Sequence, residues 1–235
     1  MKLAVPFFAL FLLAIIGCTP STDRTLPEDE DVRPVFLGFQ MIESSSLEFM
    51  PYLNRSQLTY RDASGNSFVF FAKEPVYLDF FTNTEVFPDP TNEFEEAHYN
   101  YNADKYRLEF LSAATGILLQ FELFPSICDD PKLEDEDVLI DQLEVSVRGF
   151  LSSGQNSIPV PLMTFATATQ VICSDDPNVS KRRFPEIELI EETFEDVLYV
   201  SHDLGESTFE VFYNKQWGLV AFRYQDIFWV LDKTQ

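Results

Sequence analysis

Two short stretches of this chain combine a cysteine with paired acids and a proline. The residues concerned are Cys128, Asp129 and Asp130 in the first stretch, and Cys173, Ser174, Asp175 and Asp176 in the second. Two thiols can join as a disulfide, and carboxylates can hold a hard cation such as Ca²⁺. A thiolate metal site is disfavoured, because no histidine or third cysteine lies nearby in sequence. The chemistry to weigh is therefore a cross-link and a cation site.

The acids would be drawn together only if the cysteines pair. Asp129, Asp130, Asp175 and Asp176 would then share one end of the fold, where like charges repel unless something neutralises them. The basic residues 181–183 could do so through surface ion pairs. A structural Ca²⁺ could also do so with six to eight oxygen ligands, although the run lacks the turn glycine of an EF-hand. A Ca²⁺ site and a solvated acidic loop both stay open.

No catalytic residue emerges from the sequence. His98 and His202 lie in different segments, whereas a zincin needs two histidines four residues apart. A Gly-x-Ser-x-Gly elbow and a glycine-rich phosphate loop are both absent from the sequence. With 39 acids, no carboxylate pair can be singled out as that of a glycosidase. Trp217 and Trp229 fit either core or rim positions, or a platform on which a sugar could stack.

The amino terminus predicts export and lipid anchoring. Residues 3–16 are apolar and too short for a membrane span of about 20 residues, which is typical of a signal peptide. Ile15, Ile16, Gly17 and Cys18 then resemble the lipobox of bacterial lipoproteins. The resemblance implies that residues 1–17 are removed, that Cys18 carries acyl chains such as palmitate, and that these anchor the protein stably. We therefore expect an outer-membrane lipoprotein of the cell envelope, facing the periplasm or the cell surface.

Export also decides the fate of the other two cysteines. Lipid consumes Cys18, so Cys128 and Cys173 are left as an even pair in an oxidising compartment. A disulfide between them is predicted, with two separate buried thiols as the alternative. Residues 18–34 contain three prolines and a run of acids but no aromatic residue, which predicts a tether rather than a core segment.

Composition limits the partners and the fold. The 39 acidic and 16 basic side chains give a net charge of −23, which argues against nucleic acid as a partner. Aromatic residues make up 15% of the chain, against only eight glycines, and this bias favours strands. Residues 35–235 are long enough for one sizeable core, and we expect a single β-rich domain there.

The hydrophobic period along that domain is two. Residues 58–61 with 68–71, and 106–110 with 119–123, predict two hairpins. In the second hairpin Arg107, Glu109, Gln120 and Glu122 are expected to face water. Residues 158–162 carry two prolines and suit an edge strand, while 94–99 favour a short helical turn. Five further short strands, at 187–190, 197–200, 209–213, 218–222 and 227–231, complete an antiparallel meander that forms a sandwich or barrel.

The carboxy-terminal segment 212–231 resembles the final strand pair of uncharacterised β-rich lipoproteins from Bacteroidota-type bacteria. It holds an aromatic-rich strand, an Asn214-Lys215 turn, Gly218-Leu219 and a final aromatic-rich strand. The resemblance implies an all-β envelope domain and carries no catalytic residue. We expect a non-enzymatic protein that binds or scaffolds a glycan or an envelope protein and needs no cofactor. A glycan-active enzyme of the glycoside hydrolase type is the alternative.

Overall fold

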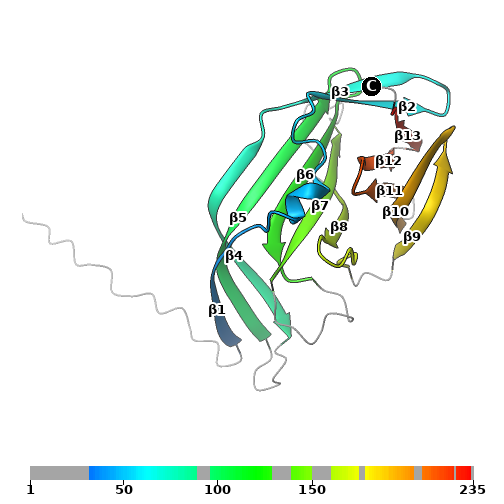
Figure 1. Cartoon of the computed structure of the whole chain (residues 1–235). Helices are drawn as coiled ribbons and strands as arrows, with labels where there is room; N and C mark the ends of the chain where they lie inside the picture. The colour runs from blue at the N-terminus through cyan, green and yellow to red at the C-terminus, as the bar shows by residue number, and fades with distance from the viewer. Residues whose placement is uncertain are drawn as a thin grey trace, which may run out of the picture.

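The computed structural model describes residues 32–88, 96–128, 139–149, 160–174, 178–203, 208–224 and 226–233. This part of the chain forms thirteen strands and one short 3-10 helix (Figure 1). In chain order they are β1 (Val32–Gln40), η1 (Ser46–Phe49), β2 (Gln57–Asp62), β3 (Ser67–Ala72), β4 (Val76–Pro88), β5 (Glu96–Ser112), β6 (Ile117–Ser126), β7 (Ile140–Gly149), β8 (Val160–Ala166), β9 (Val179–Leu189), β10 (Glu192–Asp203), β11 (Thr208–Asn214), β12 (Gly218–Tyr224) and β13 (Ile227–Leu231). The all-β prediction is confirmed, and β1 begins within the stretch expected to be tether.

All thirteen strands belong to one curled sheet. The main order is β8-β7-β6-β5-β3-β2-β13-β12-β11-β10-β9, and neighbours in this order run antiparallel. The sheet bends back on itself as a half-barrel, with β2 and β3 joining its two sides (Figure 1). Such a curl lets the inner faces of both sides share one core.

Aromatic side chains fill the interior of the half-barrel. Tyr52, which follows η1, packs against Phe110 and Phe121 with ring centroids 5.6 and 4.6 Å apart. Its hydroxyl accepts the Leu219 N–H, and burial raises the pKa of Tyr52 far above its usual range. Gly218, at φ +80°, lies so close that a Cβ there would meet the Tyr52 hydroxyl at 1.9 Å. The segment around η1 therefore locks the two sides of the curl together.

Both predicted hairpins are present, as β2–β3 and β5–β6. In the first, the Asp62 carboxylate accepts N–H groups of Ser64 and Asn66, and the Asn66 side-chain bond lowers the pKa of Asp62. In the second, Gln120 and Glu122 do not face water as expected, since they are 7% and 6% exposed. Glu122 is instead paired with cations, as described below.

The carboxy-terminal meander is also confirmed. β9 to β13 follow one another as antiparallel neighbours, at the positions that the sequence predicts. β8, the strand predicted from residues 158–162, ends the strand order next to β7, as an edge strand should. β9 forms the opposite end, and its Lys181, Arg182, Arg183 and Pro185 are the residue types that discourage a further strand from adding there.

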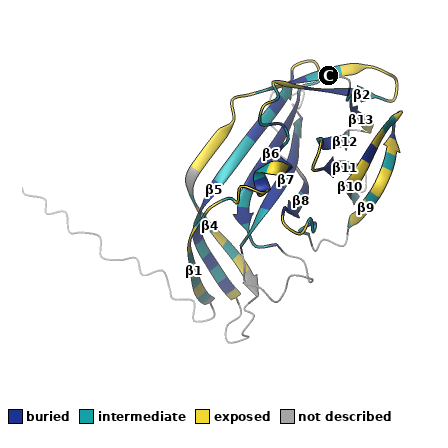
Figure 2. Ribbon diagram, in the orientation of Figure 1, coloured by how far each residue is buried: buried dark blue, intermediate teal, exposed yellow. Residues whose placement is uncertain are grey.

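A three-stranded ribbon extends from the half-barrel, toward the lower left of Figure 1. We use the name ribbon for β1, β4 and residues 96–103 of β5. β4 runs antiparallel along one edge of β5, while β1 runs parallel along the other. The helical turn expected at 94–99 is wrong from Glu96 onward, because these residues belong to β5. Figure 2 shows exposed residues on the ribbon and on β9, and mainly buried ones on β6, β7 and β12.

Candidate functional site

One face of the ribbon is open to solvent. Residues that pair across neighbouring strands share a face, so the register defines this face as three rows. We call it the ribbon face, and its members are Val86, His98 and Pro34 in the first row, Thr84, Asn100 and Phe36 in the second, and Thr82, Asn102 and Phe39 in the third. Phe36 is 79% exposed, and Phe39 and Val86 are each 49% exposed. Exposed apolar side chains that lie together make this face a candidate interaction surface.

A β-bulge places both phenylalanines on the ribbon face. Phe36 pairs with Asn100 and Phe39 with Asn102, because β1 has one extra residue between Phe36 and Gly38. Without that residue, positions 36 and 39 would point to opposite faces. Gly38 has φ +75°, a left-handed conformation that glycine adopts without steric cost. The bulge therefore creates a pair of exposed rings that simple alternation would separate.

The middle of the ribbon face is a ladder of short polar side chains. The Thr82 hydroxyl donates to Asn102 Oδ1 at 2.8 Å, and the Thr84 hydroxyl donates to Asn100 Oδ1 at 2.9 Å. Asn100 Nδ2 donates to the His98 carbonyl at 3.1 Å. These bonds fix the rotamers of the amides, and the threonine oxygens keep lone pairs that can accept further bonds. The ladder is a preorganised set of neutral donors and acceptors.

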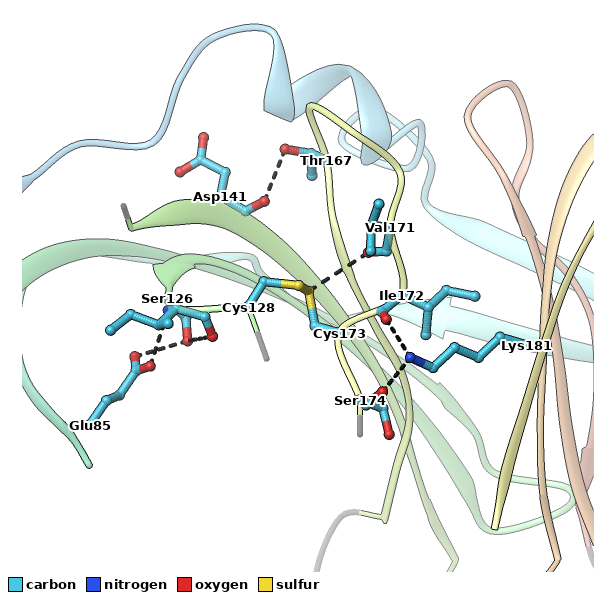
Figure 3. The surroundings of a disulfide bond; sticks show 11 residues. Glu85, Ser126, Cys128, Asp141, Thr167, Val171, Ile172, Cys173, Ser174 and Lys181 are labelled. Carbon is cyan, nitrogen blue, oxygen red and sulfur yellow. Dashed lines mark hydrogen bonds between the residues drawn. A yellow bond between two sulfur atoms is a disulfide. The ribbon is translucent and has the colours of Figure 1, made fainter. Parts of the chain in front are cut away.

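The opposite face of the ribbon is attached to the half-barrel through Glu85. Its carboxylate accepts the Tyr101 hydroxyl, Asn83 Nδ2 at 2.9 Å, the Ser126 hydroxyl at 2.9 Å and the Ile127 N–H at 3.0 Å. Figure 3 shows Glu85 reaching Ser126 at the end of β6. Tyr101 is 2% exposed, and its burial, followed by the bond to Glu85, raises its pKa. This network holds β4 against the end of β6 and so orients the ribbon face.

The nine members of the ribbon face include no Asp, Glu, Lys or Arg, and Glu96 borders its first row. His98 lies at its first row, with Nε2 3.2 Å from Glu96 Oε2. The other eight members are threonine, asparagine, proline, valine and phenylalanine. In a chain with 39 acids this is an unusual stretch of surface, and a ligand bound here would meet little repulsion from its immediate contacts.

The predicted disulfide is present between Cys128 and Cys173, with Cα atoms 5.0 Å apart. It lies between the end of β6 and the segment after β8 (Figure 3). The four acids of the predicted cation site, Asp129, Asp130, Asp175 and Asp176, lie outside the described residues. Among the residues that are described, no cluster of His, Cys, Asp or Glu is arranged to hold a metal. Lys181 reaches this region and donates to the Ile172 and Ser174 carbonyls.

The two tryptophans occupy different environments. Trp229 is 2% exposed. Its ring is parallel to that of Phe222, with centroids 6.1 Å apart, and makes a T-shaped contact with Phe68, with centroids 4.7 Å apart. The sugar-stacking role considered for Trp229 therefore does not fit, because its side chain is buried. Trp217 is half-buried, and Arg55 and Lys233 lie 5.5 and 5.6 Å from its ring centroid. These cations use the ring surface that a sugar would need.

Glu122 and Glu144 are the acid pair to consider for the glycosidase alternative, because they lie directly opposite each other on β6 and β7. Lys105 Nζ lies 2.6 Å from Glu122, and Arg107 also pairs with it, while burial and then the Glu122 charge raise the pKa of Glu144. Two carboxyl groups of which one has a raised pKa are what a glycosidase needs. The Glu122 side chain, however, is only 8% exposed and held by two cations, as in a structural ion-pair network.

No protein-family model, curated protein or solved structure matches this chain. Among the described residues, no helix is long and apolar enough to cross a membrane. Cys18, the predicted lipidation site, lies outside the residues that the structure describes.

Sequence reasoning missed the ribbon face almost completely. The sequence predicts no strand over residues 76–88, places Pro34 in the tether and assigns no functional role to His98. One signal was available: Thr82 and Thr84 alternate on one side of a strand, as do Asn100 and Asn102. The bulge at Gly38 had no signal beyond the glycine itself.

Proposed function

We propose that the protein is a lipid-anchored, non-enzymatic protein of the bacterial cell envelope that binds its ligand on the ribbon face. The observation that carries the binding role is the exposed pair Phe36 and Phe39 beside a fixed ladder of amides and hydroxyls. A soluble domain gains nothing for its own stability from two open phenylalanine rings, whereas a bound ligand would cover them.

The anchor and the ribbon face are compatible in position. The described chain begins at Val32, which pairs with Glu96 at the outer end of the ribbon. Between the lipobox Cys18 and Val32 the chain can span at most roughly 45–50 Å when fully extended. The tether would therefore keep the ribbon close to the bilayer and direct the half-barrel away from it. This arrangement suits a membrane of the envelope, with either periplasmic or surface exposure.

The anchor is tested with Cys18→Ser. We expect an unprocessed precursor that no longer incorporates radioactive palmitate, since the acylated thiol is gone. Continued labelling of the variant would contradict the lipoprotein assignment.

The binding role is tested by hydrogen exchange on the full chain, purified in mild detergent. Protein and polysaccharide fractions of the envelope and of the growth medium are added separately. We expect at least one fraction to slow exchange in β1 and in residues 96–103, with no change in β12 of the core. A uniform response, or no response to any fraction, would contradict binding at the ribbon face. Release of reducing ends that Glu144→Gln abolishes would favour the enzyme alternative instead.

A further inference from the structure

We infer that the ligand of the ribbon face is an uncharged polysaccharide chain. The inference rests on the proposed function and names its ligand class. It comes from three features of the face: its hydrogen-bonding groups, its lack of charge and the spacing of its rings.

The hydrogen-bonding groups match those of a sugar. Each hydroxyl of a pyranose both donates and accepts, and neighbouring hydroxyls are complementary to the paired N–H and C=O of an amide. The ladder offers amide and hydroxyl groups in successive rows, each held by the Thr82–Asn102 and Thr84–Asn100 bonds. Side chains that are already fixed lose little conformational entropy when a ligand binds.

The rings supply the apolar half of the recognition. Phe36 and Phe39 pair with Asn100 and Asn102, which are two residues apart on β5, so the two rings lie about 7 Å apart along the strands. One sugar unit of an extended chain covers a length of the same order, so successive units can place their C–H faces over the two rings. An exposed sheet face contacts a ligand from one side only, which favours a polymer that touches several rows over a small molecule that touches one.

The charge of the protein favours an uncharged polysaccharide over an anionic one as the ligand. The chain carries 39 acids and 16 bases, whereas the nine members of the ribbon face include neither, and Glu96 borders the face beside His98. An anionic polysaccharide would be repelled by the protein as a whole and would find no lysine or arginine among the nine members of the face. A neutral chain meets neither obstacle. A basic protein segment would suit the overall charge, but the nine members offer it no carboxylate, and that of the bordering Glu96 already contacts His98.

The test is affinity electrophoresis of the full chain in non-denaturing detergent gels. The gels contain one polymer each from an uncharged panel of dextran, hydroxyethylcellulose, xyloglucan, galactomannan and laminarin, or from an anionic panel of alginate and heparin. We expect retardation by at least one uncharged polymer and by neither anionic one. Phe36→Ala and Phe39→Ala should each weaken the retarding affinity by about tenfold or more, as for exposed aromatic anchors of other interfaces.

Phe71→Ala is the matched control. Phe71 is 57% exposed on β3 and is not part of the ribbon face, so its loss should leave retardation unchanged. All three phenylalanines are exposed, so the variants should keep the wild-type melting temperature, which is measured in parallel. Asn100→Ala provides an independent arm, because it should weaken binding without removing an aromatic ring.

Three outcomes would overturn the inference. They are no retardation by any uncharged polymer, retardation only by the anionic ones, and equal weakening by Phe36→Ala and Phe71→Ala. If the hydrogen-exchange experiment shows protection of the ribbon by a protein fraction but by no polysaccharide, the ligand class is wrong while the proposed binding role stands. If no fraction protects the ribbon, both fail.

Discussion

The half-barrel and the ribbon use phenylalanine in opposite ways. In the half-barrel, Phe110 and Phe121 are completely buried and pack on Tyr52, whereas in the ribbon Phe36 is 79% exposed. The residue type is the same, and the difference lies in what the opposite side of the sheet supplies. A curled sheet provides a second wall that covers its inner rings, while the ribbon face has no second wall among the described residues. The Phe36 and Phe39 rings are therefore exposed because β1 lies in the ribbon, which extends beyond the half-barrel.

The contrast between buried and exposed phenylalanines is tested most directly by replacing one residue of each type with alanine. Phe121→Ala should lower the free energy of unfolding by about 3–5 kcal/mol, because it leaves a cavity next to Tyr52 and Phe110. Phe36→Ala should change it by less than about 0.5 kcal/mol. Denaturant unfolding of both variants measures the difference. Similar losses would mean that Phe36 is covered in the folded protein.

The disulfide should matter next most, because it closes the junction from which the ribbon extends. Cys128 follows β6 two residues after Ser126, which bonds to Glu85 of the ribbon. Removing a bridge between positions 45 residues apart should cost roughly 2–4 kcal/mol. Cys128→Ser and Cys173→Ser should destabilise equally, and the double variant no further. Additive losses would mean that each cysteine contributes by its own packing rather than through the bridge.

Glycine distinguishes the two regions in a third way. Gly38 in the ribbon and Gly218 in the half-barrel both have positive φ, but only Gly218 has a neighbour in the way of a Cβ. Gly38→Val should cost about 1–2 kcal/mol of backbone strain and weaken binding at the ribbon face. Gly38→Asn should be nearly neutral, because asparagine tolerates this conformation. Gly218→Asn should be far more damaging, since its side chain meets the Tyr52 ring.

Melting curves of the four proteins, wild type included, rank these effects. Equal melting temperatures of Gly38→Asn and Gly218→Asn would show that Tyr52 can move to make room for the new side chain. Full binding by Gly38→Val would show that the bulge does not set the position of Phe39.

The smallest expected effect concerns the acid pair on β6 and β7. Burial raises the pKa of Glu144 above 4.5, so the folded state binds its proton more tightly than the unfolded state. Stability therefore decreases as pH rises from the unfolded pKa through the folded one. Glu144→Gln lacks this loss and relieves the repulsion by Glu122, so it should gain about 0.5 kcal/mol at neutral pH and nothing at acid pH. Unfolding free energies across the pH range check this.

Exposed Glu188 provides the control, and Glu188→Gln should show no comparable pH-dependent gain. Destabilisation of Glu144→Gln at neutral pH would mean that its charge is needed, as a partner of Lys105.

The sequence predicted the half-barrel better than the ribbon, for a physical reason. The β2–β3 and β5–β6 hairpins alternate apolar and polar residues along their strands, and their turns contain Gly65 or Gly116. The cysteine pairing followed from compartment and parity. In the ribbon, residues 96–103 also alternate, but β1 and β4 do not, since their open face mixes phenylalanine and valine with threonine. Burial of Gln120 and Glu122 was missed because polar residues normally indicate solvent, and only the structure reveals the cationic partners of Glu122.

The parallel pairing of β1 has a consequence for the order of folding. Hairpins such as β5–β6 close short loops, whereas joining Val32 to Glu96 must close a loop that includes β2, β3 and β4. Loop closure of that length is entropically costly, so β1 should dock after its neighbours have formed. Pulsed hydrogen exchange during refolding should then find β1 amides protected later than those of β6. The two phenylalanines would reach their places last, and an unfinished molecule would lack its binding surface until the end of folding.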